Sequence, residues 1–444
     1  MKKNTAISGF PEWLPAQKMI EQEYIRKIRE QFELFGFAPI ETRAVEPLTH
    51  LLKKGETDKE IYLLRRLQAE EGSGDSELGL HFDLTVPLAR YVAQNQSDLQ
   101  FPFKRYQIQK VWRGERPQEG RYREFYQADI DVIGQGSLPL YFDGEMPILL
   151  HAVMSSLPIP PVTIMVNNRK LMEGFYRGLG IEDIQTVLRI VDKLSKIGPE
   201  EVKAQLMKTV GVSESVAEKC LELAKIQQPD ASFEADVRAL GVEHPLLEEG
   251  IAELAFVMKM LERLPKGSAV ANLSIARGLD YYTGTVYEGV LEGHESLGSV
   301  CSGGRYDNLI EGGRHKYPGV GVSIGLTRIL VPFFAKGLLP SVRNTPTCVL
   351  VALVSEEGRE MSMEVAESLR TRGIAAEVYH LPQKFGKQIR YAERKGIPYV
   401  WFPGVESDQE HEVRDIRSGE QTTAEAATWN PPEEDKISVG LMGE

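Results

Sequence analysis

Apolar side chains near the start of the chain recur at the spacing of a helix, and the pattern then changes to that of a strand. Five of them follow one another at intervals of three or four residues: Ile20, Tyr24, Ile28, Phe32 and Phe35. This stripe predicts a helix that begins after Pro15 and buries one face. It stops at Gly36, a residue type that commonly ends helices. Residues 37–45 then predict a strand.

Residues 99–133 have the clearest strand pattern in the chain. Tyr, Phe, Val and Ile are frequent there and alternate with polar residues over short stretches. A polar segment that contains glycine and proline, residues 114–120, interrupts the pattern in the middle. Two strands joined by a polar loop predict an antiparallel hairpin.

Residues 168–260 instead show helical spacing and few aromatic side chains. Ser215 and Glu218 have the spacing of a capping box, in which the two side chains satisfy backbone N–H groups at a helix N-terminus. We therefore predict that this segment is a helical insertion.

The rest of the chain first shows strand patterns again, and then strand patterns alternate with helix patterns. Strands are predicted at residues 269–290 and 298–301, and a glycine-rich passage then leads to a helix near Gly325. After a connector at residues 337–346, strands and helices alternate, which predicts a small α/β domain with mostly parallel strands. Its predicted strands are 347–354, 375–379 and 399–402, and its predicted helices are 358–372 and 384–395. The acidic residues 433–435 are predicted to form a solvated tail.

Composition narrows the class of protein. The length of 444 residues corresponds to about three domains. Apolar residues make up 42% and charged residues 26%, which excludes a disordered or fibrous chain. Because the net charge is −12, a nucleic-acid partner would have to bind a local basic face.

The cysteines and the N-terminal sequence indicate in which cellular compartment the protein is expected. Cys220, Cys301 and Cys348 lie far apart and lack metal-ligand spacing, which excludes a disulfide framework and argues against a structural zinc site. The N-terminal sequence lacks the apolar core of a signal peptide, and no run approaches 18 apolar residues. We therefore predict a cytoplasmic protein without a membrane span or a protein-bound metal.

A local basic cluster lies within the predicted hairpin. Residues 104–123 contain seven basic side chains and two acidic ones. The basic residues are Lys104, Arg105, Lys110, Arg113, Arg116, Arg121 and Arg123. Planar guanidinium groups suit phosphate because they donate two parallel hydrogen bonds, so several could converge on one polyphosphate. A solvated charged hairpin is the alternative, but it leaves unexplained why Gln127, Asp129 and Asp131 alternate on the next strand.

Two further segments combine glycine with arginine and aromatic residues. Residues 276–284 place two tyrosines between glycines, with an arginine just before the first glycine. This suits the close approach of a flat ligand, although an aromatic turn fits equally well. Residues 301–307 lead to 319–328, where glycines precede a helix and could cradle phosphate. These glycines lack the spacing of a P-loop or of a dinucleotide-binding loop.

Taken in order, these segments resemble one enzyme family over essentially the whole chain. Residues 113–125 are similar to the second signature motif of the class II aminoacyl-tRNA synthetases, and residues 325–328 resemble the third. Residues 277–282, RGLDYY, and 302–307, SGGRYD, resemble the two strings that mark the histidyl-tRNA synthetases within that class.

The resemblance implies a mixed α/β (α+β) fold and a homodimer. The catalytic domain would be an antiparallel sheet flanked by helices, formed by residues 1–167 and 261–336. The helical insertion would comprise residues 168–260, and a C-terminal α/β domain at 346–444 would bind the anticodon.

The resemblance also implies roles for individual residues. Arg113 and Arg277 would be catalytic, and Arg277 would bridge the histidine carboxylate and the α-phosphate of ATP. ATP would contact Arg113, Glu115, Arg121 and Arg328, with Glu115 on the adenine amino group. The histidine pocket would comprise Asp83, Leu84, Thr85, Arg113, Gln127, Asp131, Arg277, Tyr281 and Tyr282.

The implied reaction has two steps. The carboxylate of L-histidine displaces pyrophosphate from ATP, with Mg²⁺ bridging the phosphates, and a hydroxyl of the terminal adenosine of tRNA(His) then takes the histidyl group. In-line displacement at phosphorus depends on positioning and charge neutralisation, for which arginines are suited. Asp83 and Asp131 could pair an ammonium group, while Gln and Tyr side chains could satisfy the one donor and one acceptor of a neutral imidazole.

Two positions depart from the family pattern. Arg43 stands where the first class motif, part of the dimer interface, commonly has proline. His81 stands where the family usually has arginine. We expect His81 to be structural, because the reaction leaves it no proton to move.

Two other functions fit parts of the sequence. One is a synthetase-like regulatory subunit of histidine biosynthesis, which usually lacks the C-terminal domain and the ATP arginines, and the other is a generic nucleotide-binding module. The presence of Arg113, Arg277 and Arg328 favours the enzyme. In the C-terminal domain, Lys384, Lys387 and Arg390 predict phosphate contacts on one side of a helix, or a solvated face. Two aromatic side chains, Tyr391 and Trp401, are candidate stacking surfaces for tRNA bases.

Overall fold

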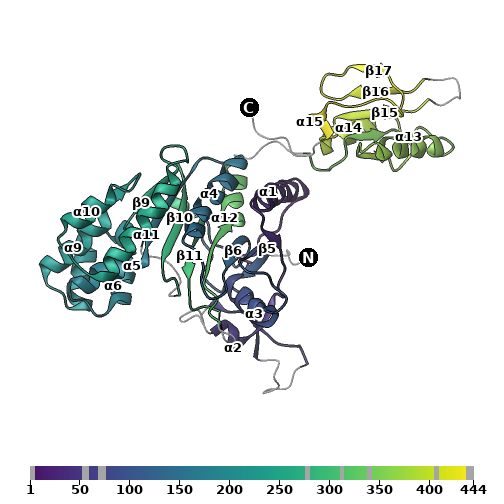
Figure 1. The fold of residues 1–444 in the computed structure, drawn as a ribbon. Coiled ribbons are helices and arrows are strands. Elements are labelled where there is room, and N and C mark those ends of the chain that lie inside the picture. Colours follow the sequence, from purple (N-terminus) through teal and green to yellow (C-terminus); the bar gives the residue numbers. More distant parts are fainter. Residues whose placement is uncertain are drawn as a thin grey trace. The chain divides into compact units, whose positions relative to one another are not determined.

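The computed structural model describes residues 6–52, 60–68, 77–275, 281–310, 315–337, 343–404 and 410–436. The chain divides into two compact units, which are Met1–Pro11 with Lys27–Phe333 and Glu12–Arg26 with Phe334–Glu444 (Figure 1). The predicted first helix is confirmed as α1, which spans Pro15–Leu34. None of the helices in the described ranges combines the length and the apolar character needed to cross a lipid bilayer.

A nine-stranded sheet forms the core of the first unit. Its strands lie in the order β1-β5-β6-β12-β11-β10-β7-β9-β8, and all pairs are antiparallel except β1 with β5 and β7 with β9. The central strands are β5 (Phe103–Trp112), β6 (Glu124–Ile133), β7 (Val162–Asn168), β9 (Ala269–Asn272), β10 (Thr285–Leu291), β11 (Cys301–Tyr306) and β12 (Gly319–Gly325). Helix α4 (Tyr141–Ser156) packs on β7 and β12. The predicted antiparallel sheet flanked by helices is therefore confirmed (Figure 1).

The predicted hairpin is the pair β5 and β6. Its register runs from Phe103 opposite Ile133 to Trp112 opposite Glu124, so the loop comprises residues 113–123. Because side chains alternate along a strand, every second residue of β6 faces the same side of the sheet. The hairpin therefore sets a row of polar side chains on one face and the basic loop at its end.

Residues 37–45 do not form one strand, so that prediction was wrong. Only β1 (Ala38–Pro39) pairs with β5 in the large sheet. The chain then leaves this sheet, and β2 (Val45–Pro47) joins a small three-stranded sheet with β4 (Leu78–Leu80) and β3 (Leu63–Leu64). The change of hydrogen-bonding partner explains the break. Two helices, α2 (Leu48–Leu51) and α3 (Thr85–Asn95), flank this region.

The segment predicted to be helical is mainly helical, and it lies at the end of the sheet formed by β9 and β8 (Figure 1). Its elements are α5 (Arg169–Gly178), α6 (Ile184–Val191), α7 (Leu194–Ile197), α8 (Pro199–Gln205), the π-helical turn η4 (Leu206–Val210), α9 (Glu214–Lys225), the short strand β8 (Gln227–Gln228), α10 (Phe233–Ala239) and α11 (Pro245–Leu261). Helix α11 packs on α5 and α4. The division into two units does not separate this segment, so its status as a domain stays a prediction.

The predicted capping box at Ser215 was wrong. Helix α9 begins at Glu214, and its N-cap is Ser213, whose hydroxyl accepts a hydrogen bond from the Val216 N–H at 3.4 Å. Ser213 has the extended backbone that an N-cap requires, whereas Ser215 already lies inside the helix.

The glycines expected to precede a helix as a phosphate cradle lie in strands β11 and β12 instead. A Cβ atom at Gly303 would lie 2.1 Å from the Gly321 carbonyl oxygen, and one at Gly321 would lie 2.1 Å from Asp131 Oδ1. These glycines therefore allow two strands and one carboxylate to pack closely. Helix α12 (Leu326–Lys336) follows β12 directly, and its start near Gly325 is confirmed.

The second unit contains a five-stranded sheet in the order β14-β13-β15-β16-β17. Its strands are β13 (Val349–Val351), β14 (Ala376–Val378), β15 (Tyr399–Phe402), β16 (Glu412–Asp415) and β17 (Gln421–Thr423), and its longer helices are α13 (Arg359–Thr371) and α14 (Phe385–Lys395). The first three strands in this order are parallel, as predicted, and the last two pairs are antiparallel.

Two predictions for this unit need correction. The acidic end is not only a solvated tail, because Asp435 in α15 (Glu433–Lys436) is buried, pairs with Arg417 at 2.7 Å and accepts a hydrogen bond from the Tyr399 hydroxyl at 2.6 Å. Trp401 is fully buried in the core, so it offers no surface on which a base could stack. Tyr391 is half-buried and packs against Tyr379.

Candidate active site

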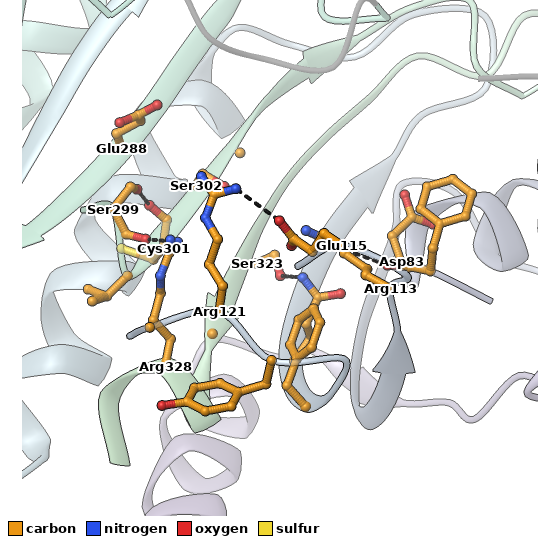
Figure 2. Close-up of a pocket in the computed structure, with 18 of the residues that line it drawn as sticks. Asp83, Arg113, Glu115, Arg121, Glu288, Ser299, Cys301, Ser302, Ser323 and Arg328 are labelled. Atoms are coloured by element: carbon orange, nitrogen blue, oxygen red, sulfur yellow. Dashed lines mark hydrogen bonds and ion pairs between the residues drawn. The ribbon is translucent and has the colours of Figure 1, made fainter. Parts of the chain in front are cut away.

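A cavity of about 420 Å³ opens in the first unit beside the basic loop of the hairpin (Figure 2). Seven of the residues assigned from the family resemblance line it: Asp83, Arg113, Glu115, Arg121, Gln127, Tyr282 and Arg328. A small inner recess of about 20 Å³ is lined by Thr85, Asp131, Tyr281 and also by Tyr282. Leu84 is buried and lines neither space. Arg277 lies outside the described residues.

Three guanidinium groups converge on the cavity from different elements. Arg113 follows β5, donates from Nε to the Phe82 carbonyl oxygen at 3.0 Å and lies 5.1 Å from the centre of the Phe125 ring. Arg121, from the hairpin loop, donates to Glu115 at 2.9 Å. Arg328 of α12 donates to the Ser299 carbonyl oxygen at 2.5 Å (Figure 2). A cavity lined by three arginines suits a polyphosphate.

Most of the basic cluster takes no part in this convergence. Of the seven basic residues predicted to be candidates, only Arg113 and Arg121 line the cavity. Lys104 pairs with Glu145 at 3.0 Å, and Lys110 pairs with Glu124 at 2.5 Å. Lys104 is therefore paired with helix α4 and Lys110 with the neighbouring strand β6, and these carboxylates neutralise the two lysines.

Strand β6 supplies the polar end of the site. Gln127, Asp129 and Asp131 are buried on one face of this strand, as their alternation predicts. Gln127 donates from Nε2 to Ser323 Oγ at 2.9 Å. Asp131 pairs with the fully buried Arg105 at 2.5 Å and accepts a hydrogen bond from the Tyr306 hydroxyl at 2.7 Å. Both oxygens of Asp131 therefore have a partner within the protein.

Asp83 and the paired tyrosines complete this end. Asp83 precedes α3, and its Oδ1 accepts a hydrogen bond from the Val86 N–H at 3.0 Å, which fixes the carboxylate at the start of the helix. The rings of Tyr281 and Tyr282 lie 4.6 Å apart. Burial raises the pKa of both phenols above the ordinary value, so they are neutral hydrogen-bonding groups.

Asp129 was not assigned a role from the sequence, although its place in the alternating row was visible. It lines the inner recess and is 3% exposed. Burial raises the pKa of its carboxyl to about 7, while the charge of Arg105 and a hydrogen bond from Ser323 oppose that rise. A carboxyl group that titrates near neutrality inside a pocket is typical of functional sites.

The two positions that depart from the family pattern have structural contacts. His81 is fully buried, its Nε2 lies 2.7 Å from the Lys110 carbonyl oxygen, and its ring stacks on Trp112. Burial lowers the pKa of His81, so the ring is neutral and donates from Nε2 to that carbonyl group. Arg43 contacts Glu46 at 3.2 Å.

Comparison with known proteins agrees with the site. The family model described as histidyl-tRNA synthetase matches residues 9–329, and that of an anticodon binding domain matches residues 348–428. A protein of Cutibacterium acnes named histidine–tRNA ligase is 54% identical over 453 residues and covers 100% of both chains. The crystal structure of the histidyl-tRNA synthetase of a Nostoc species superposes with a TM-score of 0.85 at 36% identity, and the match covers 96% of this chain and 98% of that one.

A more distant match shares the fold alone. The Bacillus halodurans protein described as an ATP phosphoribosyltransferase regulatory subunit/histidyl-tRNA synthetase has a TM-score of 0.73 at 21% identity, over 90% of this chain and 98% of that one. The Cutibacterium acnes protein is more than 50% identical over the full length, and the family model matches residues 9–329. Together these two matches establish the family. This chain belongs to the histidyl-tRNA synthetase family.

Proposed function

We propose that this chain is a histidine–tRNA ligase, which activates L-histidine with ATP and transfers it to the 3′ end of tRNA(His). One observation carries the proposal: three arginines and Gln127 line a cavity, and the adjoining recess is lined by the buried carboxylates Asp129 and Asp131. The arginines suit the phosphates of ATP, and the buried amide and carboxylate groups suit an amino acid with a polar ring.

At the phosphate end, the arginines neutralise charge. Arg113 contacts the α-phosphate and Arg121 the outer phosphates, while Arg328 holds ATP from the start of α12. Arg277 bridges the histidine carboxylate and the α-phosphate. Glu115 reads the adenine amino group. Because no covalent nucleophile is needed, preorganised donors of this kind account for the chemistry of the first step.

At the amino-acid end, Asp83, Thr85 and Gln127 bind the ammonium group. Asp131, which the sequence suggested for that group, already has Arg105 and Tyr306 as partners of its two oxygens. Asp131, Tyr281 and Tyr282 lie about the imidazole, and Leu84, the chain neighbour of Asp83 and Thr85, is buried. Arg113 joins the two ends because it contacts the phosphate next to the amino acid. The individual roles follow from the family resemblance, and the lining of the cavity and its recess by all of these residues except Leu84 supports them.

Mg²⁺ fits the site as an ion carried by ATP. Within the described residues, no group of three or more metal-ligating side chains is present. Mg²⁺ is usually held by substrate phosphates, water and one or two carboxylates, and Glu288 lines the cavity as such a carboxylate (Figure 2). The ion would supply further neutralisation of the phosphate charge.

For the second step, we propose that residues 346–444 bind the anticodon of tRNA(His). The family match over residues 348–428 supports this assignment. The catalytic domain is then residues 1–167 with 261–336, and the insertion is residues 168–260. We further propose a homodimer in the cytoplasm, as expected for a protein that charges tRNA in this family.

Histidine-dependent exchange of labelled pyrophosphate into ATP tests the proposal. The ligase should catalyse this exchange with L-histidine and should charge tRNA(His). A regulatory protein with the synthetase fold would bind histidine without exchange. Absence of exchange by a folded protein that binds ATP would contradict the proposed function.

A further inference from the structure

Asp129 occupies the centre of the polar face of β6. It lies opposite Gln107 of β5 and opposite Ser323 of β12. The inner recess that it lines shares Tyr282, Ser302 and Ser323 with the main cavity, so the two spaces adjoin. A volume of about 20 Å³ is enough for one small polar group and too small for a whole side chain.

One oxygen of Asp129 is unsatisfied. Within the described chain, its Oδ1 is buried and has no hydrogen-bond partner. The next carboxylate on the same face differs, since Arg105 and Tyr306 engage Asp131. A buried acceptor without a donor is unfavourable, and its retention is explained when a ligand supplies the donor.

We infer that Asp129 selects the substrate, because its Oδ1 accepts a hydrogen bond from the ring N–H of histidine at the mouth of the inner recess. This inference rests on the proposed function and adds a residue to it. The edge of the ring points into the recess, while the rest of the amino acid lies in the main cavity. A carboxylate at this point would reject a ring of the same shape that lacks an N–H group.

The other lining groups favour the ring over the ammonium group as the donor. Tyr281, Tyr282 and Tyr306 line the recess, and their planar side chains suit the edge of a flat ring. Burial raises the pKa of all three phenols, so they donate hydrogen bonds and do not compete as anions. Asp83 and Gln127 line the main cavity instead and remain for the ammonium group.

The charge of Asp129 depends on its neighbours. Arg105 from β5 and Ser323 from β12 lower its pKa, while Asp131 on β6 and Asp83 before α3 raise it. Burial dominates and raises the pKa to about 7. The carboxylate is thus formed as the pH rises through about 7, and the hydrogen bond from the ring should strengthen in the same range.

Two variants and two histidine analogues test the inference in pyrophosphate exchange by the full-length protein. Asp129→Leu removes the acceptor at similar size, and Asp129→Asn retains an uncharged oxygen. Thiazolylalanine lacks the ring N–H. Triazolylalanine retains a ring N–H, and its ring is not protonated near pH 7. Asp98→Asn, an exposed aspartate outside both spaces, is the matched control.

We expect Asp129→Leu to raise the KM for histidine by roughly 10- to 150-fold and to leave the KM for ATP within about twofold. The wild type should prefer histidine strongly over thiazolylalanine, and this preference should collapse in Asp129→Leu. With triazolylalanine, kcat/KM should rise through pH 7 in the wild type and stay flat in Asp129→Asn. The control should match the wild type.

Other outcomes separate this inference from the proposed function. If both Asp129 variants lower thermal stability but keep the wild-type KM and the preference against thiazolylalanine, Asp129 is structural and the inference is overturned. If Asp129→Leu does not fold, the pH profile and analogue preference of Asp129→Asn decide. If the wild type itself shows no histidine-dependent exchange, the proposed function fails and the inference falls with it.

Discussion

Arg121 donates a hydrogen bond from Nη1 to Oε2 of Glu115 at 2.9 Å, and both side chains line the same cavity. They are proposed to contact opposite ends of ATP, so ATP must separate them when it binds. Both side chains are partly exposed, at 33% and 21%, and such pairs contribute about 1 kcal/mol or less. The pair therefore positions the two groups at little cost to ATP binding.

Arg121→Ala should weaken ATP binding without unfolding the protein. The loss of a charge-assisted contact to phosphate costs about 1.5–3 kcal/mol, so we expect the KM for ATP to rise by about tenfold or more while the KM for histidine changes little. Arg116→Ala is the matched control, because this arginine belongs to the same loop but is exposed and does not line the cavity. Equal effects of the two variants on ATP would show that the loop acts only through its overall charge.

Asp131→Asn should destabilise the protein as well as affect histidine binding. Arg105 is fully buried and pairs with this carboxylate, and breaking such a pair from one side costs about 3–5 kcal/mol. Urea unfolding should show a lower midpoint. The double variant Arg105→Met with Asp131→Asn should recover part of the loss, because no unpaired charge remains.

If Asp131→Asn instead unfolds like the wild type and only the KM for histidine rises, the carboxylate acts mainly on the substrate. Measuring both KM values beside the unfolding curves distinguishes the two roles. The KM for ATP should remain nearly unchanged in either case.

Arg277→Ala should slow adenylate formation far more than it weakens ATP binding. The proposed contact bridges charge that moves between the carboxylate and the α-phosphate, and removing one preorganised donor typically costs about 10²–10³ in rate. Single-turnover formation of the adenylate measures the step directly. A loss below about fivefold would rule out this role for Arg277.

Removal of the residues from 340 onward should leave pyrophosphate exchange largely intact and abolish efficient charging of tRNA(His). Every described side chain that lines the cavity and its recess belongs to residues 60–328. Charging at near full-length efficiency by the truncated protein would show that this part does not read the anticodon.

Within the C-terminal unit, the exposed side chains of Lys384, Lys387 and Arg390 lie at the N-cap and in the first half of α14. Replacing all three by alanine should weaken tRNA charging, flatten its dependence on salt and leave exchange unchanged, because phosphate contacts release counterions. Unchanged charging over a salt series would identify this side of α14 as a solvated face.

The local pattern of apolar and polar residues predicted many of the strands and helices of this protein. The period of two in residues 99–133 predicted the hairpin and placed Gln127, Asp129 and Asp131 on one face, because side chains alternate in any strand. The segments that resemble the family motifs contain Arg113, Arg121 and Arg328, the three arginines that line the cavity. The alternation after residue 346 predicted the parallel strands of the second unit in the same way.

Tertiary structure decided which of these side chains are available to a ligand. The sequence contains the positive charge of Arg105 and Arg121 alike, but only the fold buries Arg105 against Asp131 and places Arg121 in the cavity. The glycines of β11 and β12 were expected to cradle phosphate before a helix, whereas here they permit close strand packing.

The same distinction applies to Trp401 and Asp129. Trp401 was predicted to be a stacking surface but is buried in a core. Asp129 was given no role from the sequence, but it is buried in a recess and, within the described chain, one of its oxygens has no hydrogen-bond partner. Burial and pairing depend on which strands become neighbours, and a pattern read along one strand does not contain that information. The sequence by itself thus determined the family, the main elements and the face of each strand, and the packing of β5, β6 and β12 decided which groups on that face remain for the substrate.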